Sequence, residues 1–310
     1  MQNNEKLRSP FPQPWVVGIT RNDRSPIVCS GVLINELYVL TTANCARMTT
    51  GSSRVIIAAP EMSLNRKSTS FASETTILQQ LRAGAQSGNN ATVDKTKEPA
   101  ANNLDDEDNS SPFFDSLPIM DVRINPKFVS SLSNVASYSL RNDIALIRLQ
   151  HKLPLAQRKS RATAICLPDQ PFARLHEPYE RVHIAGYAAA FSGQSQKLSK
   201  TDANESDRFL WQREAALLSS GECKQIWKQF YQKGRQLCTQ ARQNGLCEGG
   251  LGSGLTVRRY GRQYLLGLLS LGSRQCARSS MPDLFVDLAP YLPWIYRNTV
   301  DSAYCTDRVE

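Results

Sequence analysis

Residues 29–34 read CSGVLI and residues 38–45 read YVLTTANC, and these two stretches decide the fold of the chain. Each holds a run of apolar and β-branched residues that has the length of a strand. A short segment with polar residues separates the two runs. We therefore predict two β-strands here, over residues 27–33 and 38–42.

Similar short runs recur along the chain, separated by turn residues. The predicted strands cover residues 15–19, 27–33, 38–42, 55–58, 119–124, 144–149, 181–185, 264–271 and 284–286. Many short strands with few helices indicate an all-β barrel or sandwich. A helical pattern appears at the end of the chain, over 288–300, and a shorter one over 220–231, with Ser219 or Ser220 as its N-cap.

Residues 63–116 interrupt this succession of short predicted strands. The segment is polar and includes the acidic run DDED at 105–108. Such a composition buries too little apolar surface to offset the entropy that ordering costs. We predict a long surface insertion that is mostly disordered, with one short helical pattern over 74–81.

Three sequons of the form Asn-x-Ser/Thr lie in polar segments. Asn90 and Asn109 fall inside the predicted insertion, and Asn204 falls in another polar loop. In a secreted protein these asparagines are glycosylation sites. Because so short a motif also arises by chance, unmodified asparagines are the alternative.

The composition limits the class of protein. The chain has 310 residues, of which 41% are hydrophobic, and no run approaches the roughly 18 apolar residues that a membrane span needs. The eight cysteines include no CxxC pair, and the three histidines, His151, His176 and His183, lie apart from them. This pattern favours disulfides over a metal site, and disulfides indicate an extracellular compartment. No metal or cofactor is predicted.

The amino terminus shows no apolar signal segment. Met1 is followed by the polar residues QNNE. We therefore expect a mature fragment, an excised domain or a chain given an added initiator methionine.

The net charge of +9 leaves two interpretations of the surface open. One is a site for an anionic partner, such as a glycosaminoglycan or a membrane surface. The other is a basic face that is simply solvated. Positive residues cluster at Arg158, Lys159 and Arg161 and at Arg258, Arg259 and Arg262. Neither cluster alternates with exposed aromatic residues as nucleic-acid binders often do, so no nucleic-acid partner is predicted.

Two further blocks follow the first in a fixed order, RNDIALIRL at 141–149 and GLCEGGLGSGL at 245–255. In this order and spacing, the blocks resemble the trypsin/chymotrypsin family of serine proteases. Shorter matches extend the resemblance over nearly the whole chain outside the insertion: ICLP at 165–168, GYA at 186–188, SLG at 270–272 and WI at 294–295.

The resemblance implies an all-β fold. We expect two six-stranded antiparallel β-barrels with a C-terminal α-helix, forming a single trypsin-like domain over residues 1–310. Lobe one is expected at about 14–160 and lobe two at about 167–300, joined by the segment around 165–168.

The chemistry of that family needs a histidine base, a serine nucleophile and a buried aspartate that orients the histidine. The positions that match these residues are Asn44, Leu251 and Asp143. An amide has no protonation equilibrium near neutral pH, and leucine has no nucleophile. The resemblance therefore predicts a pseudoprotease, in which Asp143 serves as a buried hydrogen-bond acceptor.

Ser253 is the alternative nucleophile. It lies six residues after Cys247 rather than four, so its use would shift the turn and leave Leu255 where the family has glycine. No histidine of the aligned first lobe faces it. A hydrolase with displaced residues is thus the weaker hypothesis.

The activation apparatus of the family is also altered. Relatives insert a new amino terminus that pairs with an aspartate next to the serine, and Gly250 stands at that position here. An aspartate kept at position 250 without the inserted amine would bury an uncompensated charge. The absence of both partners of this ion pair is therefore self-consistent. The oxyanion hole would use the N–H groups of Gly249 and Leu251, and we expect it not to form.

The substrate cleft is partly kept. The positions that the resemblance assigns to this vestigial pocket are Gly245, Ser270, Leu271, Gly272 and Asp283. Asp283 replaces a glycine of the pocket wall. Its carboxylate would accept a basic side chain of a peptide, fill the pocket, or pair with an arginine such as Arg274. Filling or internal pairing is the preferred interpretation.

The cysteines also match the resemblance to the trypsin/chymotrypsin family. Three pairs match bridges of the family, Cys29–Cys45, Cys223–Cys238 and Cys247–Cys276. Cys166 and Cys305 remain, and we predict that they pair because the C-terminal helix packs near the linker in this fold. A bond to another chain is the alternative.

These observations predict a secreted, non-catalytic serine protease homologue. It would act by protein binding, as a cofactor, decoy or scaffold in an extracellular proteolytic cascade, with a protease, zymogen or inhibitor as its partner. Two alternatives are a serine-type endopeptidase with non-standard catalytic residues and a module that binds glycosaminoglycans or anionic surfaces.

Overall fold

The computed structural model describes nine segments of the chain. They are residues 13–23, 25–58, 114–129, 140–155, 162–168, 177–189, 208–240, 250–272 and 282–305. All of them belong to one compact unit, formed by residues 1–64 and 112–310. Most of the predicted insertion, with its helical pattern and its sequons, lies outside the described residues.

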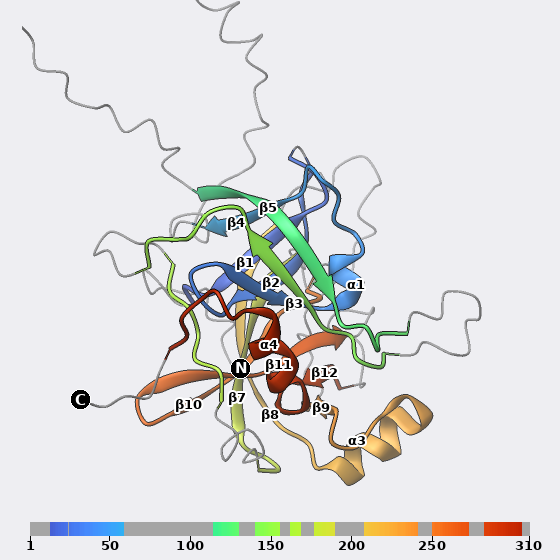
Figure 1. Ribbon diagram of the computed structural model, residues 1–310. Coiled ribbons are helices and arrows are strands. Elements are labelled where there is room, and N and C mark those ends of the chain that lie inside the picture. Colours follow the sequence, from blue (N-terminus) through green and yellow to red (C-terminus); the bar gives the residue numbers. More distant parts are fainter. Residues whose placement is uncertain are drawn as a thin grey trace, which may run out of the picture. The chain divides into compact units, whose positions relative to one another are not determined.

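The first six strands form a closed antiparallel barrel (Figure 1). They are β1 (Val16–Thr20), β2 (Ile27–Leu33), β3 (Tyr38–Thr41), β4 (Arg54–Ala58), β5 (Phe114–Ile124) and β6 (Ala145–Leu149), in the spatial order β1-β2-β3-β6-β5-β4. The pairing of Gly18 with Ile56 joins β1 to β4 and closes the barrel. Closure leaves no strand edge unpaired.

The other six strands form a second antiparallel sheet. They are β7 (Arg181–Ala189), β8 (Arg208–Ala216), β9 (Gln236–Cys238), β10 (Gly254–Arg259), β11 (Arg262–Leu271) and β12 (Leu284–Asp287), in the order β8-β7-β10-β11-β12-β9. Its outer strands meet only through a bridge between Leu217 and Thr239, so this sheet is a half-barrel. The predicted all-β fold class, two six-stranded antiparallel β-barrels with a C-terminal helix, is confirmed, with the second barrel only half closed.

The strand predictions were incomplete. Strands β8, β9 and β10 were missed, because β8 (RFLWQREAA) mixes charged with apolar residues, β9 has three residues, and β10 ends in two arginines. Strand β5 begins at Phe114 rather than at 119 and so takes in the last residues of the predicted insertion. Pairing with neighbouring strands overrides a weak local pattern.

Two helices lie where the sequence predicted them. Helix α3 (Ser220–Trp227) begins after Ser219, whose hydroxyl accepts from the N–H of Glu222 while the Glu222 carboxylate accepts from the N–H of Ser219. This capping box satisfies two otherwise unpaired donors, and a 3-10 turn, η2 (Lys228–Phe230), follows. The C-terminal helix α4 (Leu292–Asn298) follows the 3-10 turn η3 (Ala289–Tyr291) and ends two residues before the predicted boundary at 300.

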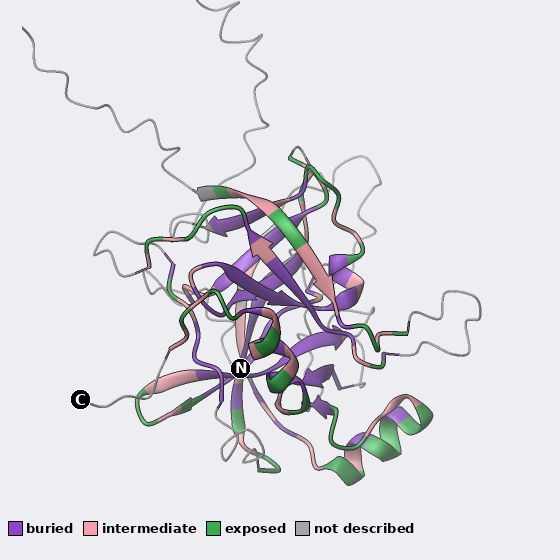
Figure 2. Ribbon diagram, viewed as in Figure 1, coloured by how far each residue is buried: buried purple, intermediate pink, exposed green. Residues whose placement is uncertain are grey.

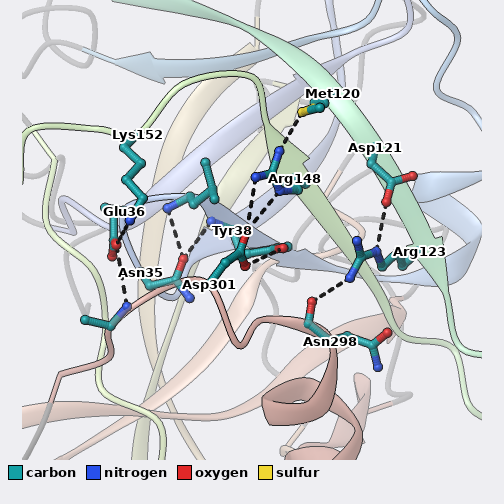
Figure 3. A network of polar contacts seen from close by, with 12 residues as sticks. Asn35, Glu36, Tyr38, Met120, Asp121, Arg123, Arg148, Lys152, Asn298 and Asp301 are labelled. Atoms are coloured by element: carbon teal, nitrogen blue, oxygen red, sulfur yellow. Dashed lines mark hydrogen bonds and ion pairs between the residues drawn. The ribbon is translucent and has the colours of Figure 1, made fainter.

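A network of polar contacts fastens the C-terminal segment to the first barrel (Figure 3). The hydroxyl of Tyr38 donates to the Asp301 carboxylate over 2.8 Å, and Arg148 pairs with the same carboxylate at 3.0 Å. Arg123 donates to the carbonyl of Asn298, at the end of α4, over 2.8 Å. The arginine thus satisfies a carbonyl that the helix itself leaves unpaired.

Ser30, on β2, joins the two sheets. It is fully buried, and its N–H donates to the carbonyl of Leu251 over 2.8 Å. Its hydroxyl accepts from the N–H of Tyr187, on β7, over 2.7 Å, and its carbonyl accepts from the hydroxyl of Thr41 over 2.7 Å. The main buried core likewise includes side chains from both sheets, and Figure 2 shows that most strands of both are buried.

The same contact leaves no room at Gly252. Its φ is +82°, and a Cβ atom there would overlap the carbonyl oxygen of Ser30. We therefore expect Gly252→Ala to lower the free energy of unfolding by about 3 kcal/mol or more, from the left-handed backbone and the overlap together. Urea denaturation measures this loss.

Gly234→Ala is the matched control. Gly234 has a φ of +71°, but its Cβ would meet nothing within 4 Å. The variant should lose only about 1 kcal/mol, the cost of the left-handed backbone alone. Equal losses at the two positions would contradict a steric role for the Ser30 carbonyl.

Candidate functional site

Asn44 lies on a single helical turn between β3 and the loop that leads to β4. This turn, α1 (Ala43–Ala46), was not predicted, and Thr42 caps it by accepting from the N–H of Cys45. The disulfide between Cys29 and Cys45 ties the turn to β2. Asn44 is half-buried.

Asp143 is fully buried beside this turn. One carboxylate oxygen accepts from the backbone N–H of Asn44 over 2.8 Å, and the other accepts from the hydroxyl of Ser270 over 2.6 Å. The Asn44 side chain is a further hydrogen-bond partner. Three residues that the sequence assigned to the site are thus brought together from two barrels.

Burial and hydrogen bonding shift the pKa of the Asp143 carboxyl in opposite directions. Loss of water contact is the largest effect and raises the pKa of the carboxyl above its usual value, whereas the hydrogen bonds from Ser270 and Asn44 lower it. Because burial wins, the protonated form is favoured more than in a free aspartate.

Leu251 occupies a tight turn just before β10. Its carbonyl accepts from Ser30, and the N–H of the next residue, Gly252, donates to Leu269 over 2.9 Å. The Leu251 side chain is half-buried and packs against the main core. The turn is therefore held by backbone contacts on both sides, with an apolar side chain at its apex.

Ser253 is fully buried, two residues further on. Its hydroxyl lies 3.4 Å from the hydroxyl of Ser30, and its carbonyl accepts from the N–H of Leu269 over 2.8 Å. A side chain added at Gly186 would overlap the Ser253 hydroxyl. This serine is a packing residue between the barrels and is closed to any substrate.

Asp283 forms an internal ion pair. Its carboxylate binds the guanidinium of Arg213, on β8, and the side chains are 4% and 14% exposed respectively. Its carbonyl also accepts from Thr239. The partner therefore differs from the arginine suggested by the sequence, Arg274, which lies outside the described residues. No local signal marks Arg213, because it is 70 residues away in the sequence and lies on β8, which does not pair with β12.

The remaining residues assigned to the cleft differ in how far they are buried, and some lie outside the described residues. Ser270 is buried, and Leu271 pairs with Leu284 of β12 in a register that shifts by one residue. Leu271 and Gly272 are partly exposed at the end of β11. Gly245 and Gly249, assigned to the pocket floor and the oxyanion hole, lie outside the described residues.

Three of the four expected disulfides are present among the described residues: Cys29–Cys45, Cys223–Cys238 and Cys166–Cys305. The pair Cys247–Cys276 falls outside them. The Cys166–Cys305 bond closes the longest loop, with a sequence separation of 139 residues. It fastens the end of the chain to the segment that joins the two sheets.

Two other kinds of feature, a metal cluster and a membrane-spanning helix, are absent from the described residues. No group of three or more His, Cys, Asp or Glu side chains in them is arranged to hold a metal ion. No helix among them has the length and apolar character needed to cross a membrane.

Comparisons with known proteins agree with this fold. The chain is 25% identical over 293 residues to CLIP domain-containing serine protease B4 of Anopheles gambiae, covering 92% of this chain and 66% of that protein. It is 28% identical over 170 residues to coagulation factor XII of Cavia porcellus, covering 52% of this chain and 26% of that protein.

A further relative is the inactive CLIP domain-containing serine protease A3 of Aedes aegypti, 26% identical over 189 residues, with 58% of this chain and 36% of that protein covered. The chain thus spans less than two thirds of the length of each relative. A family model described as Trypsin matches residues 3–108 and 119–295, which is most of the sequence. The chain belongs to the trypsin family.

Proposed function

We propose that this chain is a non-catalytic member of the trypsin family that acts by binding another extracellular protein. The observation that carries the proposal is the residue beside Asp143. Asn44 stands there, where the family's mechanism needs a general base, and its amide neither takes up nor releases a proton near neutral pH.

The contacts of Asp143 support a structural role for this aspartate. One of its oxygens anchors the helical turn that carries Asn44, and the other anchors Ser270 on β11. Leu251, at the position of the nucleophile, packs into the core. The aspartate therefore has reasons to be kept that do not involve catalysis.

The alternative of an endopeptidase with displaced residues has less support. Its candidate nucleophile, Ser253, is fully buried and hydrogen-bonds with Ser30. A nucleophile needs access to the substrate and a base within hydrogen-bonding reach. The ion pair between Asp283 and Arg213 also leaves the pocket carboxylate already neutralised.

The relatives indicate the kind of partner. Their names include a coagulation factor and CLIP domain serine proteases, one of which is named inactive. By this likeness, the chain would serve as cofactor, decoy or scaffold in an extracellular proteolytic cascade, with a protease, zymogen or inhibitor bound. Secretion fits the three disulfides, and glycans at Asn90, Asn109 and Asn204 remain part of the proposal.

A fluorophosphonate probe tests the loss of catalysis. We expect the purified chain to show only background labelling, because neither Leu251 nor the buried Ser253 offers an activated hydroxyl. Trypsin is the positive control, and heat-denatured chain gives the background. Labelling above that background that disappears on Ser253→Ala would overturn the proposal.

Affinity purification from the extracellular fluid of the source organism, followed by mass spectrometry, tests the binding role. We expect enrichment of a protease, a zymogen or a protease inhibitor. The Gly252→Ala variant, in which the loop beside Ser30 is disturbed, is the comparison. Equal recovery of unrelated proteins by both forms would count against a specific partner.

The variant Asp143→Asn tests the structural role of the aspartate through the pH dependence of stability. Burial raises the pKa of the Asp143 carboxyl in the folded protein above its value in the unfolded chain, which is about 3.9. The stability that Asp143 contributes is therefore complete below that unfolded pKa. It is lost as the pH rises through the folded pKa, because the buried carboxyl must then ionise. Asparagine can still accept from Asn44 and can donate to Ser270. We expect the variant to match or exceed the parent's melting temperature at pH 7, with a flatter profile above about pH 4.

Thermal unfolding between about pH 4 and 8 measures this difference. Asp143→Ala is the control, and it should lose about 2–3 kcal/mol because the donors from Asn44 and Ser270 are left buried without an acceptor. A steeper loss of stability with rising pH in Asp143→Asn than in the parent would refute this account.

A further inference from the structure

The Cys166–Cys305 disulfide is the most accessible of the three that the structure describes. The other two join residues that are each exposed by 1% or less, Cys29–Cys45 and Cys223–Cys238. Cys166 is 6% exposed, and Cys305 is half-buried. Thiol exchange requires that an attacking thiolate reach one of the two sulfurs. Among these three bonds, only Cys166–Cys305 meets that requirement, through the sulfur of Cys305.

A guanidinium group lies beside this sulfur. Arg262, at the start of β11, donates to Sγ of Cys305 over 3.7 Å. The thiolate that attacks a disulfide is an anion, and its charge spreads over the sulfurs as the old bond breaks. A cation next to the attacked sulfur attracts the thiolate and stabilises that charge. The contact therefore directs attack to Cys305 and favours thiols that carry further negative charge.

The Cys166 side of the bond is held in place by backbone contacts. The N–H of Cys166 donates to the carbonyl of Gln263 over 3.3 Å, and its carbonyl accepts from the N–H of Leu265 over 3.0 Å. The N–H of the preceding residue, Ile165, donates to the carbonyl of Leu33 over 3.0 Å. The segment that joins the two sheets is thus fastened to both of them without the disulfide.

The C-terminal side has anchors of its own on the first barrel. Asp301 accepts from the hydroxyl of Tyr38 and pairs with Arg148 (Figure 3). The ring of Tyr304, the last residue before the disulfide, meets the ring of Tyr296 edge to face, with the centroids 5.0 Å apart. Opening of the bond therefore leaves both sides in position, and the bond is able to form again.

We propose that the Cys166–Cys305 disulfide is a site of reversible exchange with an anionic thiol of low molecular mass, of the chemical class of glutathione. The thiolate attacks Sγ of Cys305, the bond to Cys166 breaks, and its electron pair passes to the Cys166 sulfur, which takes up a proton from water. The products are a mixed disulfide at Cys305 and a free thiol at Cys166, so no other oxidant or reductant is needed. Attack by the Cys166 thiolate on the mixed disulfide reverses the step.

This inference does not depend on the proposed loss of catalysis, and reduced glutathione tests it on the intact folded chain. After incubation, free thiols are blocked with N-ethylmaleimide, and the peptides are identified by mass spectrometry. We expect glutathione on Cys305 and N-ethylmaleimide on Cys166, while Cys29–Cys45 and Cys223–Cys238 stay closed. Glutathione on Cys166, opening of either buried bond at an equal rate, or no modification at all would overturn the proposal.

Arg262→Gln tests the part played by the guanidinium group. The quantity measured is the ratio of the exchange rate with glutathione to that with cysteamine, a cationic thiol, each corrected for its fraction of thiolate. A general change in the fold affects both rates and cancels in the ratio. We expect the ratio to fall about fivefold, the size of effect that one partly exposed charge produces.

Lys224→Gln is the matched control, because it removes an exposed positive charge from α3. Helix α3 lies at the lower right of Figure 1, whereas the hairpin of β10 and β11 lies at the lower left. The control should keep the parent's ratio. An unchanged ratio in Arg262→Gln, or an equal fall in Lys224→Gln, would overturn the proposed direction of attack.

Asp301→Ala tests the reversal of the exchange. When glutathione is removed from the modified parent, the bond should close again, because two groups held side by side react at a high effective concentration. We expect closing to be about tenfold slower in Asp301→Ala, which loses the contacts with Tyr38 and Arg148. Asp23→Ala, which removes an exposed carboxylate between β1 and β2, should close like the parent. Equal closing rates in all three proteins would overturn the proposed role of the anchors.

Discussion

The buried contacts of Ser30 are the constraint on which the rest of this structure depends. Through its N–H, hydroxyl and carbonyl, this one residue of the first barrel binds Leu251 in the turn before β10, Tyr187 on β7 of the second sheet and Thr41 of its own barrel. Each of these groups is away from water, and a buried donor without an acceptor costs about 1–3 kcal/mol. The loop beside β10 is therefore held in place by folding, whether or not it performs chemistry.

This constraint explains which parts of the site persist. Asp143 supports the turn that carries Asn44 and the strand that carries Ser270, so replacing it by an apolar residue would leave two donors unsatisfied. At positions 44 and 251 the protease reaction demands a histidine and a serine, whereas here Asn44 hydrogen-bonds with Asp143 and Leu251 packs against the core. A fold of this kind can lose its base and its nucleophile while it keeps the aspartate.

The sequence predicted the features that depend on local patterns or on ordered motifs. The apolar strands, the capped helix α3 and the neighbourhood of Asn44 and Asp143 belong to this group. Strand β8 and the partner of Asp283 do not. Arg213 and Asp283 are 70 residues apart, and β8 does not pair with β12, so neither a local pattern nor strand pairing predicts that they meet. The joint at Ser30 likewise depends on packing between sheets, which no single stretch of sequence encodes.

Strand β10 connects the turn of Leu251 with the end of the hairpin at Tyr260. It begins at Gly254, next to the turn of Leu251, and ends at Arg259, next to the exposed Tyr260. Because β10 is paired on both sides, with β7 and β11, two neighbouring strands fix its position. The turn of Leu251, which leads into this strand, is therefore held by the second sheet as well as by the hydrogen bond from Ser30.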